Sequence, residues 1–195
     1  MKKAILFLLM LLMLTSCAVH TPDSLFQTVC SADEALKLAK KTDTVVFEQQ
    51  GCTSGREVWD SFFRSVSNGK PASVLCAHYF VLDKERISEE LYEEEENEYP
   101  KLFFYYVEYD GKEYHIKTRE STKETPDDRE TFQNLLHLTG EAPETALYSA
   151  YDRYVLTDEP SITWEDIEAG LYSSQAGAGY RHFTVYEDFS GWRGE

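Results

Sequence analysis

The chain has 195 residues, of which 35 are acidic and 19 basic, and its formal net charge is −16. This excess of acid argues against nucleic-acid binding, which requires a basic surface. The length suits one domain, or two small ones, with an ordinary hydrophobic core.

The N-terminal segment reads MKKAILFLLMLLMLTSCAVH. Two lysines precede an uncharged run from Ala4 to Leu14, as in an export signal. The strongly apolar part, Ile5 to Leu14, would form a helix of about 15 Å, against roughly 30 Å for the hydrocarbon core of a bilayer. A membrane span is therefore not expected.

Leu14-Thr15-Ser16 leads directly into Cys17, and this four-residue pattern resembles the lipobox of bacterial lipoproteins. The resemblance implies that residues 1–16 are a signal peptide, that a diacylglyceryl group is attached to the Cys17 thiol, and that the protein is anchored in the cell membrane on its extracytoplasmic face. Two acyl chains give stable anchoring, where one would be marginal. The alternative is a plain secretory signal followed by an incidental cysteine.

Removal of residues 1–16 takes away two lysines and no acid, which leaves 17 basic and 35 acidic residues and a formal charge of −18 over 179 residues. Such a chain has little attraction for anionic lipid beyond its acyl chains. We therefore expect contact with the membrane through the N-terminal lipid alone. Residues 17–28 are predicted to form a lipidated tether and residues 29–195 a single domain.

The remaining cysteines are Cys30, Cys52 and Cys76, so at most one internal disulfide can form and one thiol stays free. Their separations match no CxxC redox motif and no zinc-binding spacing. The pattern favours buried structural thiols and leaves open whether two of them form a disulfide.

Helix and strand signals alternate at the start of the predicted domain. A capping box of Ser31 and Glu34, followed by apolar residues at helical spacing, predicts a helix over 31–41. The β-branched segment 44–49 predicts a strand, and the glycines of 50–55 predict a loop.

Residues 54–71 carry the clearest helix pattern of the chain. Ser54 and Glu57 have the spacing of a second capping box, and Asn68-Gly69 closes the helix. One stripe of this helix is apolar and is expected to face the core: Val58, Trp59, Phe62, Phe63 and Val66.

Residues 72–82 are apolar on both strand faces, which predicts a central strand packed on both sides. Residues 83–98 then contain nine acids and two bases, and Ile87, Leu91 and Tyr92 could hold a short helix in place. Because the spaced aspartates and the glycine of an EF-hand loop are missing, we expect a solvated acidic run rather than a calcium site.

Residues 101–120 form two β-rich runs around Asp110-Gly111, a strong hairpin signal. A two-residue turn would place Val107 opposite Tyr114 on a face expected to be core. The other face would pair Glu108 with Glu113, Tyr106 with His115, Phe104 with Lys117, and Leu102 with Arg119.

The C-terminal third is predicted to be mostly strand. Residues 129–143 alternate like a strand, although 125–128 could start a helix, and strands are also expected over 146–159 and 182–189. Between them Thr163 should cap a helix whose inward side chains are Trp164, Ile167, Leu171 and Tyr172. Since no βαβ alternation is sustained, the order favours an α+β fold with a single curved antiparallel sheet and about three helices packed on it.

About a third of the chain, in its middle, resembles an uncharacterised domain of small lipoproteins of Gram-positive bacteria. The similar features are the helix EVWDSFFRSVSNGKP, the strand SVLCAHYFVLD and the later YDGK hairpin. That family has no established activity, so the resemblance implies no catalytic residue.

The sequence encodes no complete catalytic motif that we recognise. In GCTSG the serine is the fourth residue, whereas a nucleophile elbow needs it third. Cys52 lies near a helix start that could lower its pKa, but nothing pairs it with a histidine. Cys76 and His78 share a strand face, yet without a third ligand they favour packing over metal binding. We expect no metal and no cofactor.

The second face of the hairpin is the candidate binding surface. It combines aromatic and basic side chains in an otherwise acidic chain: Phe104, Tyr106, His115, Lys117 and Arg119. Such a surface could hold an anionic or ring-bearing ligand, or a protein partner. The alternative is that a helix covers the aromatic side chains while the charged tips reach water.

The function expected from these features is that of a non-enzymatic binding or interaction protein of the cell envelope, with a protein or small-molecule ligand. One alternative is an exported hydrolase or thiol enzyme with unidentified catalytic residues. Another, a transporter's solute-binding lipoprotein, is disfavoured because 179 residues are few for two lobes that close on a ligand.

Overall fold

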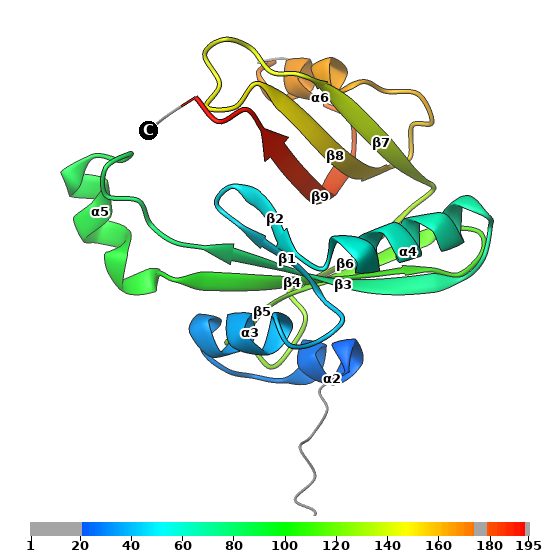
Figure 1. Ribbon diagram of the computed structural model, residues 1–195, viewed down its shortest axis with the longest axis horizontal. Helices are drawn as coiled ribbons and strands as arrows, with labels where there is room; N and C mark the ends of the chain where they lie inside the picture. Colours follow the sequence, from blue (N-terminus) through cyan, green and yellow to red (C-terminus); the bar gives the residue numbers. More distant parts are fainter. Residues whose placement is uncertain (1–20, 174–178, 194–195) are drawn as a thin grey trace, which may run out of the picture.

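The computed structural model describes residues 21–173 and 179–193. The predicted signal peptide and Cys17 lie outside these residues. The described chain has an α+β fold that stacks two sheets, with helices on the outer side of each sheet and one helix beside the interface (Figure 1). None of the described helices combines the length and the apolar character needed to cross a membrane.

Five α-helices lie in the described residues: α2 Pro22–Gln27, α3 Ala32–Ala39, α4 Arg56–Ser67, α5 Glu89–Glu95 and α6 Trp164–Leu171. A 3-10 turn, η1 Glu96–Glu98, continues α5. The strands are β1 Val45–Glu48, β2 Gly51–Ser54, β3 Ala72–Phe80, β4 Lys101–Tyr109, β5 Tyr114–Glu120, β6 Asp128–Phe132, β7 Asn134–Glu141, β8 Ala150–Thr157 and β9 His182–Ser190.

The prediction of one antiparallel sheet is wrong. A six-stranded sheet has the order β2-β1-β3-β4-β5-β6, and a separate three-stranded sheet has the order β7-β8-β9. The larger sheet is mixed because β1 and β3 pair in parallel, with Val45 opposite Cys76. The segment between them contains the β2 hairpin strand and α4, and this helix provides the crossover that a parallel pair requires.

The two sheets are joined at Gln133. The alternating segment 129–143 is extended, as predicted, but β6 pairs with β5 while β7 pairs with β8. A single residue separates the two strands, and its backbone N–H donates to the Asp158 carboxylate at 3.3 Å. Such a bend lets one extended run leave the first sheet and enter the second.

Three apolar clusters define the layers of the molecule. α2 and α3 cover one face of the six-stranded sheet, where Leu25 of α2 belongs to the same apolar cluster as Phe104 of β4. α4 and the three-stranded sheet pack on its opposite face around Trp59 and Tyr186, and α6 covers the far side of the three-stranded sheet (Figure 1). Because side chains from both sheets belong to one apolar cluster, the two sheets pack against each other.

Part of the predicted tether is packed structure. Residues 22–27 form α2, which is capped by Thr21 and has Pro22 in its first turn. Leu25 and Phe26 are 0% and 4% exposed beneath the sheet. The folded region therefore begins before residue 29, because two apolar side chains in this short helix are buried.

The predicted helix at 31–41 and its capping box are confirmed in α3. α4 also forms, with Trp59, Phe62 and Val66 buried, but the capping box of Ser54 and Glu57 is wrong. The N-cap is Gly55 in the left-handed region at φ 78°, and Ser54 belongs to β2, so the predicted loop 50–55 is largely strand.

The hairpin at 101–120 is confirmed, but its register is shifted by two residues from the prediction. Four residues, 110–113, separate the strands, so Glu108 faces His115, and Tyr106 faces Lys117. The Asp110 carboxylate accepts from the backbone N–H groups of Lys112 and Glu113 and favours this longer turn. A shift of two residues leaves every side chain on its predicted face.

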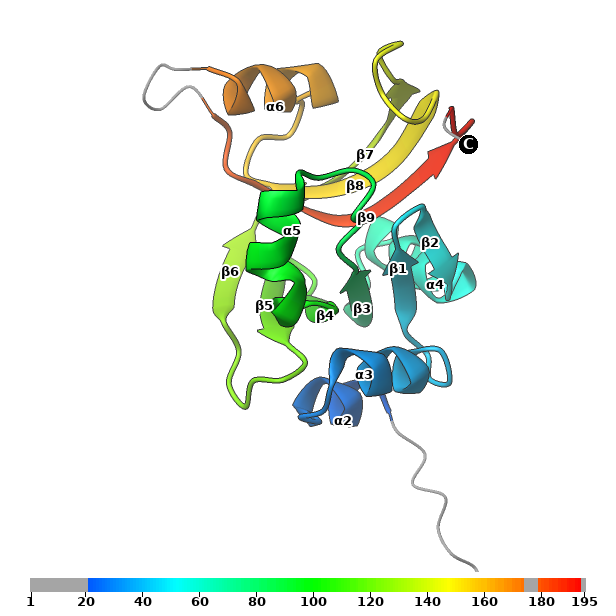
Figure 2. The ribbon, with the colours of Figure 1, turned by 90° about the vertical axis from the view of Figure 1, so that its left-hand side faces the viewer.

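Two further elements differ in detail. The acidic segment contains α5, which has no buried residue and stands at the left-hand end of the molecule in Figure 1, so that it lies in the foreground of Figure 2. α6 begins at the predicted Thr163 cap and buries Ile167, but Leu171 and Tyr172 are 64% and 87% exposed. The helix ends at Leu171, so these two side chains lie beyond the part that packs on the sheet.

Candidate functional site

The five side chains predicted as one surface have three different environments. Phe104 and Arg119 are 0% and 1% exposed beneath α2, so they do not reach the surface. Tyr106 and Lys117 are partly exposed beside α2, and His115 lies at the hairpin turn. A helix thus covers Phe104, as the alternative interpretation supposed, but the guanidinium of Arg119 does not reach water as that interpretation expected.

Arg119 has a structural role in this arrangement. Its Nε donates to the Phe26 carbonyl at 2.6 Å and its Nη2 to the Thr28 carbonyl at 2.8 Å, where α2 ends. Its Nη1 donates to the carbonyls of Glu120, Ser121 and Lys123. The side chain therefore ties the end of α2 to the loop after β5, and burial lowers its pKa.

Tyr106 and Lys117 border a hollow of about 360 Å³ beside α2. The Lys117 ammonium lies 5.7 Å from the centre of the Tyr106 ring. Asp23, Glu108 and Arg129 also line this hollow, so charges of both signs face it. The hollow has no buried polar atom without a hydrogen-bond partner, and nothing in its lining selects a particular ligand.

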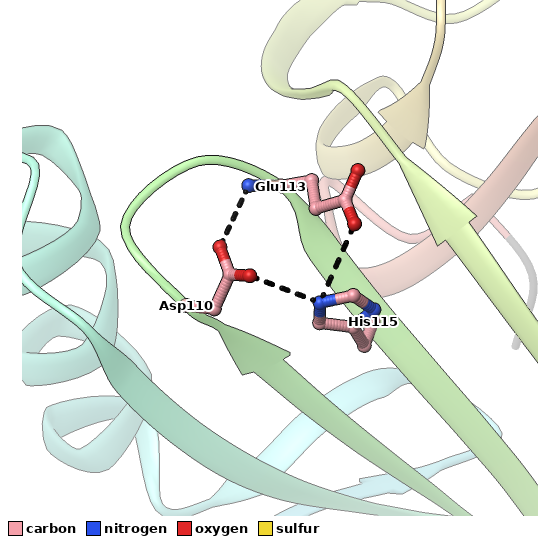
Figure 3. Close-up of side chains that lie close together, drawn as sticks. All are labelled: Asp110, Glu113 and His115. Atoms are coloured by element: carbon pink, nitrogen blue, oxygen red, sulfur yellow. Dashed lines mark hydrogen bonds and ion pairs between the residues drawn. The ribbon is translucent and has the colours of Figure 1, made fainter.

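His115 belongs to a triad with Asp110 and Glu113 at the turn (Figure 3). Its Nε2 lies 3.4 Å from an Asp110 oxygen and 3.8 Å from a Glu113 oxygen, and its Nδ1 lies 3.2 Å from the Thr131 hydroxyl. These are the donors that a divalent transition-metal ion would use in the described chain. All three side chains are partly or fully exposed and already bond within the turn, so we assign them to holding its shape.

A cavity between the two sheets has the features of a binding site. Its volume is about 270 Å³, and it lies where the ends of β1 and β3 meet the start of β2 and the C-terminal part of β9. The walls are mostly aromatic and aliphatic: Phe47, Tyr79, Phe80, Val81 and Phe189. The remaining lining residues are Glu48, Gln49, Gly51, His78, Asp83, Arg86 and Glu187. An apolar cavity with a few polar groups is typical of small-molecule sites.

His78 is the polar side chain buried in this lining. It is 6% exposed, and its ring is stacked on Phe47 with centroids 4.3 Å apart and an interplanar angle of 13°. Tyr105 packs on it as well, at 4.3 Å and 33°. Burial lowers the pKa of His78 to about 3, so the ring is neutral at physiological pH.

One ring nitrogen of His78 has no hydrogen-bond partner in the described chain. A backbone hydrogen bond with Val185 raises the pKa of the ring, against the larger effect of burial, so Val185 contributes an acceptor, its carbonyl. Nε2 is buried and has no partner.

The charged residues of the cavity wall are paired. Glu48 bonds Lys40 at 2.7 Å, Asp83 bonds Arg86 at 3.1 Å, and Glu187 bonds Arg153 at 3.2 Å. The hydroxyl of Thr53 also donates to Glu48, whose pKa is lowered by its bonds to Lys40 and Thr53 despite its partial burial. No described lining residue offers a free positive charge to an anionic ligand.

The cysteines do not have the features of catalytic thiols. Burial raises the pKa of Cys52 and Cys30, and it raises that of the fully buried Cys76 well above the usual value. The Cys52 thiol donates to the Ser54 carbonyl at 3.5 Å. All three thiols are free, so no disulfide joins them, and their thiolate forms are disfavoured.

The sequence did not identify this cavity, although it contained a partial signal. Their strand spacing predicts that Cys76 and His78 share one face, and both side chains do face the core between the sheets. The cavity walls, however, come from β1, β2, β3 and β9, which are up to about 140 residues apart in sequence. Comparison of the chain with protein-family models, curated proteins and solved structures finds no match. Its function must therefore be argued from the geometry of the site.

Proposed function

We propose that this protein is a lipid-anchored extracytoplasmic binding protein of the cell envelope, and that it holds a small molecule in the cavity between its two sheets. The anchor rests on the lipobox-like segment ending at Cys17. The binding role rests on one observation, a cavity of about 270 Å³ between the sheets whose lining combines aromatic side chains with the buried imidazole of His78. Apolar walls with a few polar groups are typical of small-molecule sites.

The position of α2 allows Cys17 to be anchored in the membrane while the cavity stays accessible. α2 begins at Pro22, five positions after Cys17, which is at most about 18 Å of extended chain. α2 lies on one face of the six-stranded sheet (Figure 1), and the cavity is lined in part by β9 of the sheet that packs on the opposite face. An acyl anchor at Cys17 would therefore hold the α2 side near the membrane and leave the cavity accessible.

The anchor is tested by replacing its cysteine. Wild-type protein expressed in a bacterium that processes lipoproteins is expected in the membrane fraction and labelled by a radioactive fatty acid, whereas Cys17→Ser should lose the label. Cys30→Ser is the matched control and should keep it. Equal labelling of the wild type and Cys17→Ser would refute the anchor.

The binding role is tested with a library of small ring-bearing molecules in a thermal-shift screen, because a ligand that binds the folded state raises Tm. Val81 lines the cavity and is 40% exposed, so Val81→Trp should fill the opening without disturbing the core. Leu171→Trp, on exposed α6 away from the cavity, is the control. A screen that yields no ligand sensitive to Val81→Trp would refute binding in this cavity.

A further inference from the structure

We propose that the inter-sheet cavity binds a neutral sugar ring, as a free monosaccharide or as one residue of a glycan. This inference rests on the proposed binding function and adds the chemical class of the ligand. It follows from the apolar side chains at the mouth of the cavity, from the hydrogen-bonding groups beside them and from the balance of charge.

Apolar side chains at the mouth of the cavity provide a surface for one face of a ring. Phe80 and Val81 line the cavity and are 44% and 40% exposed, whereas Phe47 lies deeper and is 4% exposed. Phe189 of β9 is half-buried and lines the cavity from the second sheet. The faces of a sugar ring carry C–H groups, which lose contact with water when they pack on such side chains. The volume of about 270 Å³ suits a single ring.

Accessible hydrogen-bonding groups lie beside these side chains. The exposed amide of Gln49 has no partner among the described residues. Arg86 contacts Asp83 through Nε and Glu187 contacts Arg153 through Oε2, so the Nη groups of Arg86 and Oε1 of Glu187 are left to face a ligand. The side chains of Arg86 and Glu187 are 52% and 37% exposed.

These groups favour hydroxyls on the ligand. They include donors and acceptors, and a hydroxyl group can both donate and accept. An apolar ring in the cavity would take water from the Gln49 amide and return no hydrogen bond, which is unfavourable. A ring with hydroxyls around its edge satisfies such groups while its face packs on the apolar side chains.

The charges favour a neutral ligand. Three acids line the cavity, and each has a basic partner within 3.2 Å: Glu48, Asp83 and Glu187. The basic residue of the lining, Arg86, is the partner of Asp83. A ligand carboxylate would therefore meet more acids than bases, and a ligand ammonium would have to compete with the existing pairs.

A panel of neutral methyl glycosides tests the inference with wild-type protein: those of glucose, galactose, mannose and N-acetylglucosamine. We expect at least one to bind with a dissociation constant of about 1–10 mM, ordinary for a single small ring. Val81→Trp should abolish this binding, and Leu171→Trp should leave it unchanged. Ligand-observed NMR measures the affinities. Tighter binding of the β-1,4-linked disaccharide indicates a glycan as the source, and weaker binding indicates a free monosaccharide.

Analogues of the best glycoside test the hydroxyls and the charge. Tetrahydropyran has the ring of a sugar without its hydroxyls and should bind at least tenfold more weakly. The uronic acid and the amino sugar of the same ring each carry one charge and should bind at least threefold more weakly. Equal or tighter binding of tetrahydropyran, or of either charged analogue, would overturn the inference.

Gln49→Leu is the matched variant, because leucine is similar in size but has no amide. It should weaken binding of the best glycoside at least fivefold and leave tetrahydropyran unaffected. Gln50→Leu is the control, since Gln50 is the next exposed residue and is not part of the cavity lining. Phe80→Ala should also weaken the glycoside at least fivefold. Near-UV circular dichroism and Tm show whether each variant is folded, and if Phe80→Ala is not, the exposed Gln49→Leu decides.

The outcomes separate the ligand class from the binding role. Binding of none of the four glycosides, binding that survives Val81→Trp, or full affinity in Gln49→Leu would overturn the sugar ligand. A different compound from the library screen that binds the wild type but not Val81→Trp would then leave the binding role intact. Failure of both the panel and the screen would refute both proposals.

Discussion

Replacement of Arg119 by methionine should strongly destabilise the protein and release α2 from the sheet. The guanidinium is 1% exposed and has no carboxylate partner, so its stabilising contacts are hydrogen bonds to backbone carbonyls. The acceptors are the carbonyls of Phe26, Thr28, Glu120, Ser121 and Lys123. Methionine can fill part of the space beside Phe26 and Phe104 but satisfies none of them.

The magnitude follows from these acceptors. A buried carbonyl that loses its partner costs about 1 kcal/mol or more, and three of the five bonds are only partly buried, so water can replace some of them. We expect a loss of about 3–5 kcal/mol in the free energy of unfolding. Arg119→Lys keeps the charge but fewer hydrogen bonds, and should lose less.

Urea unfolding at constant m-value measures this loss. Lys117→Met is the matched control, because Lys117 lies on the same strand face but reaches the surface, and it should change stability by less than about 0.5 kcal/mol. Hydrogen exchange should show that the amides of α2 lose protection first in Arg119→Met. A loss below about 1 kcal/mol, or unchanged protection of α2, would refute the structural role of this arginine.

Three other predictions concern the backbone, the cavity and the thiols. Gly55→Ala should cost more than about 2 kcal/mol in urea unfolding, because φ is 78° and the new Cβ would collide with the Thr44 carbonyl oxygen. Gly69→Ala, at φ 66° in open space, is the control and should cost about 1 kcal/mol. Similar costs of the two substitutions would contradict the steric explanation. His78 has a pKa of about 3 when folded and near 6.5 when unfolded, so between these pH values the unfolded chain binds more protons than the folded chain. The free energy of unfolding should therefore be highest above about pH 6.5 and lower by about 2 kcal/mol at pH 5. A His78→Phe variant with the same dependence on pH would show that another group is responsible. Because burial raises the pKa of Cys52, its reaction with a thiol reagent at pH 7 should be slow in folded protein and fast in urea; rapid modification of the folded protein, absent in Cys52→Ala, would instead support the thiol-enzyme alternative.

Local patterns predicted most elements of this fold. The apolar stripe of α4, the capping box of α3 and the strand on either side of Asp110-Gly111 each depend on residues that are neighbours in sequence, and each was found. The hairpin register was less certain, because it depends on whether the Asp110 carboxylate binds two backbone N–H groups and lengthens the turn.

The sequence by itself thus determined the α+β class, the acidic surface and the apolar faces of most helices and strands. Only the tertiary structure decided what covers each face. Alternation shows that a strand has two faces but not that α2 covers Phe104 and Arg119, nor that one extended run changes sheet at Gln133. The cavity around His78 has the same origin, because its walls come from strands far apart in the chain whose meeting depends on long-range packing.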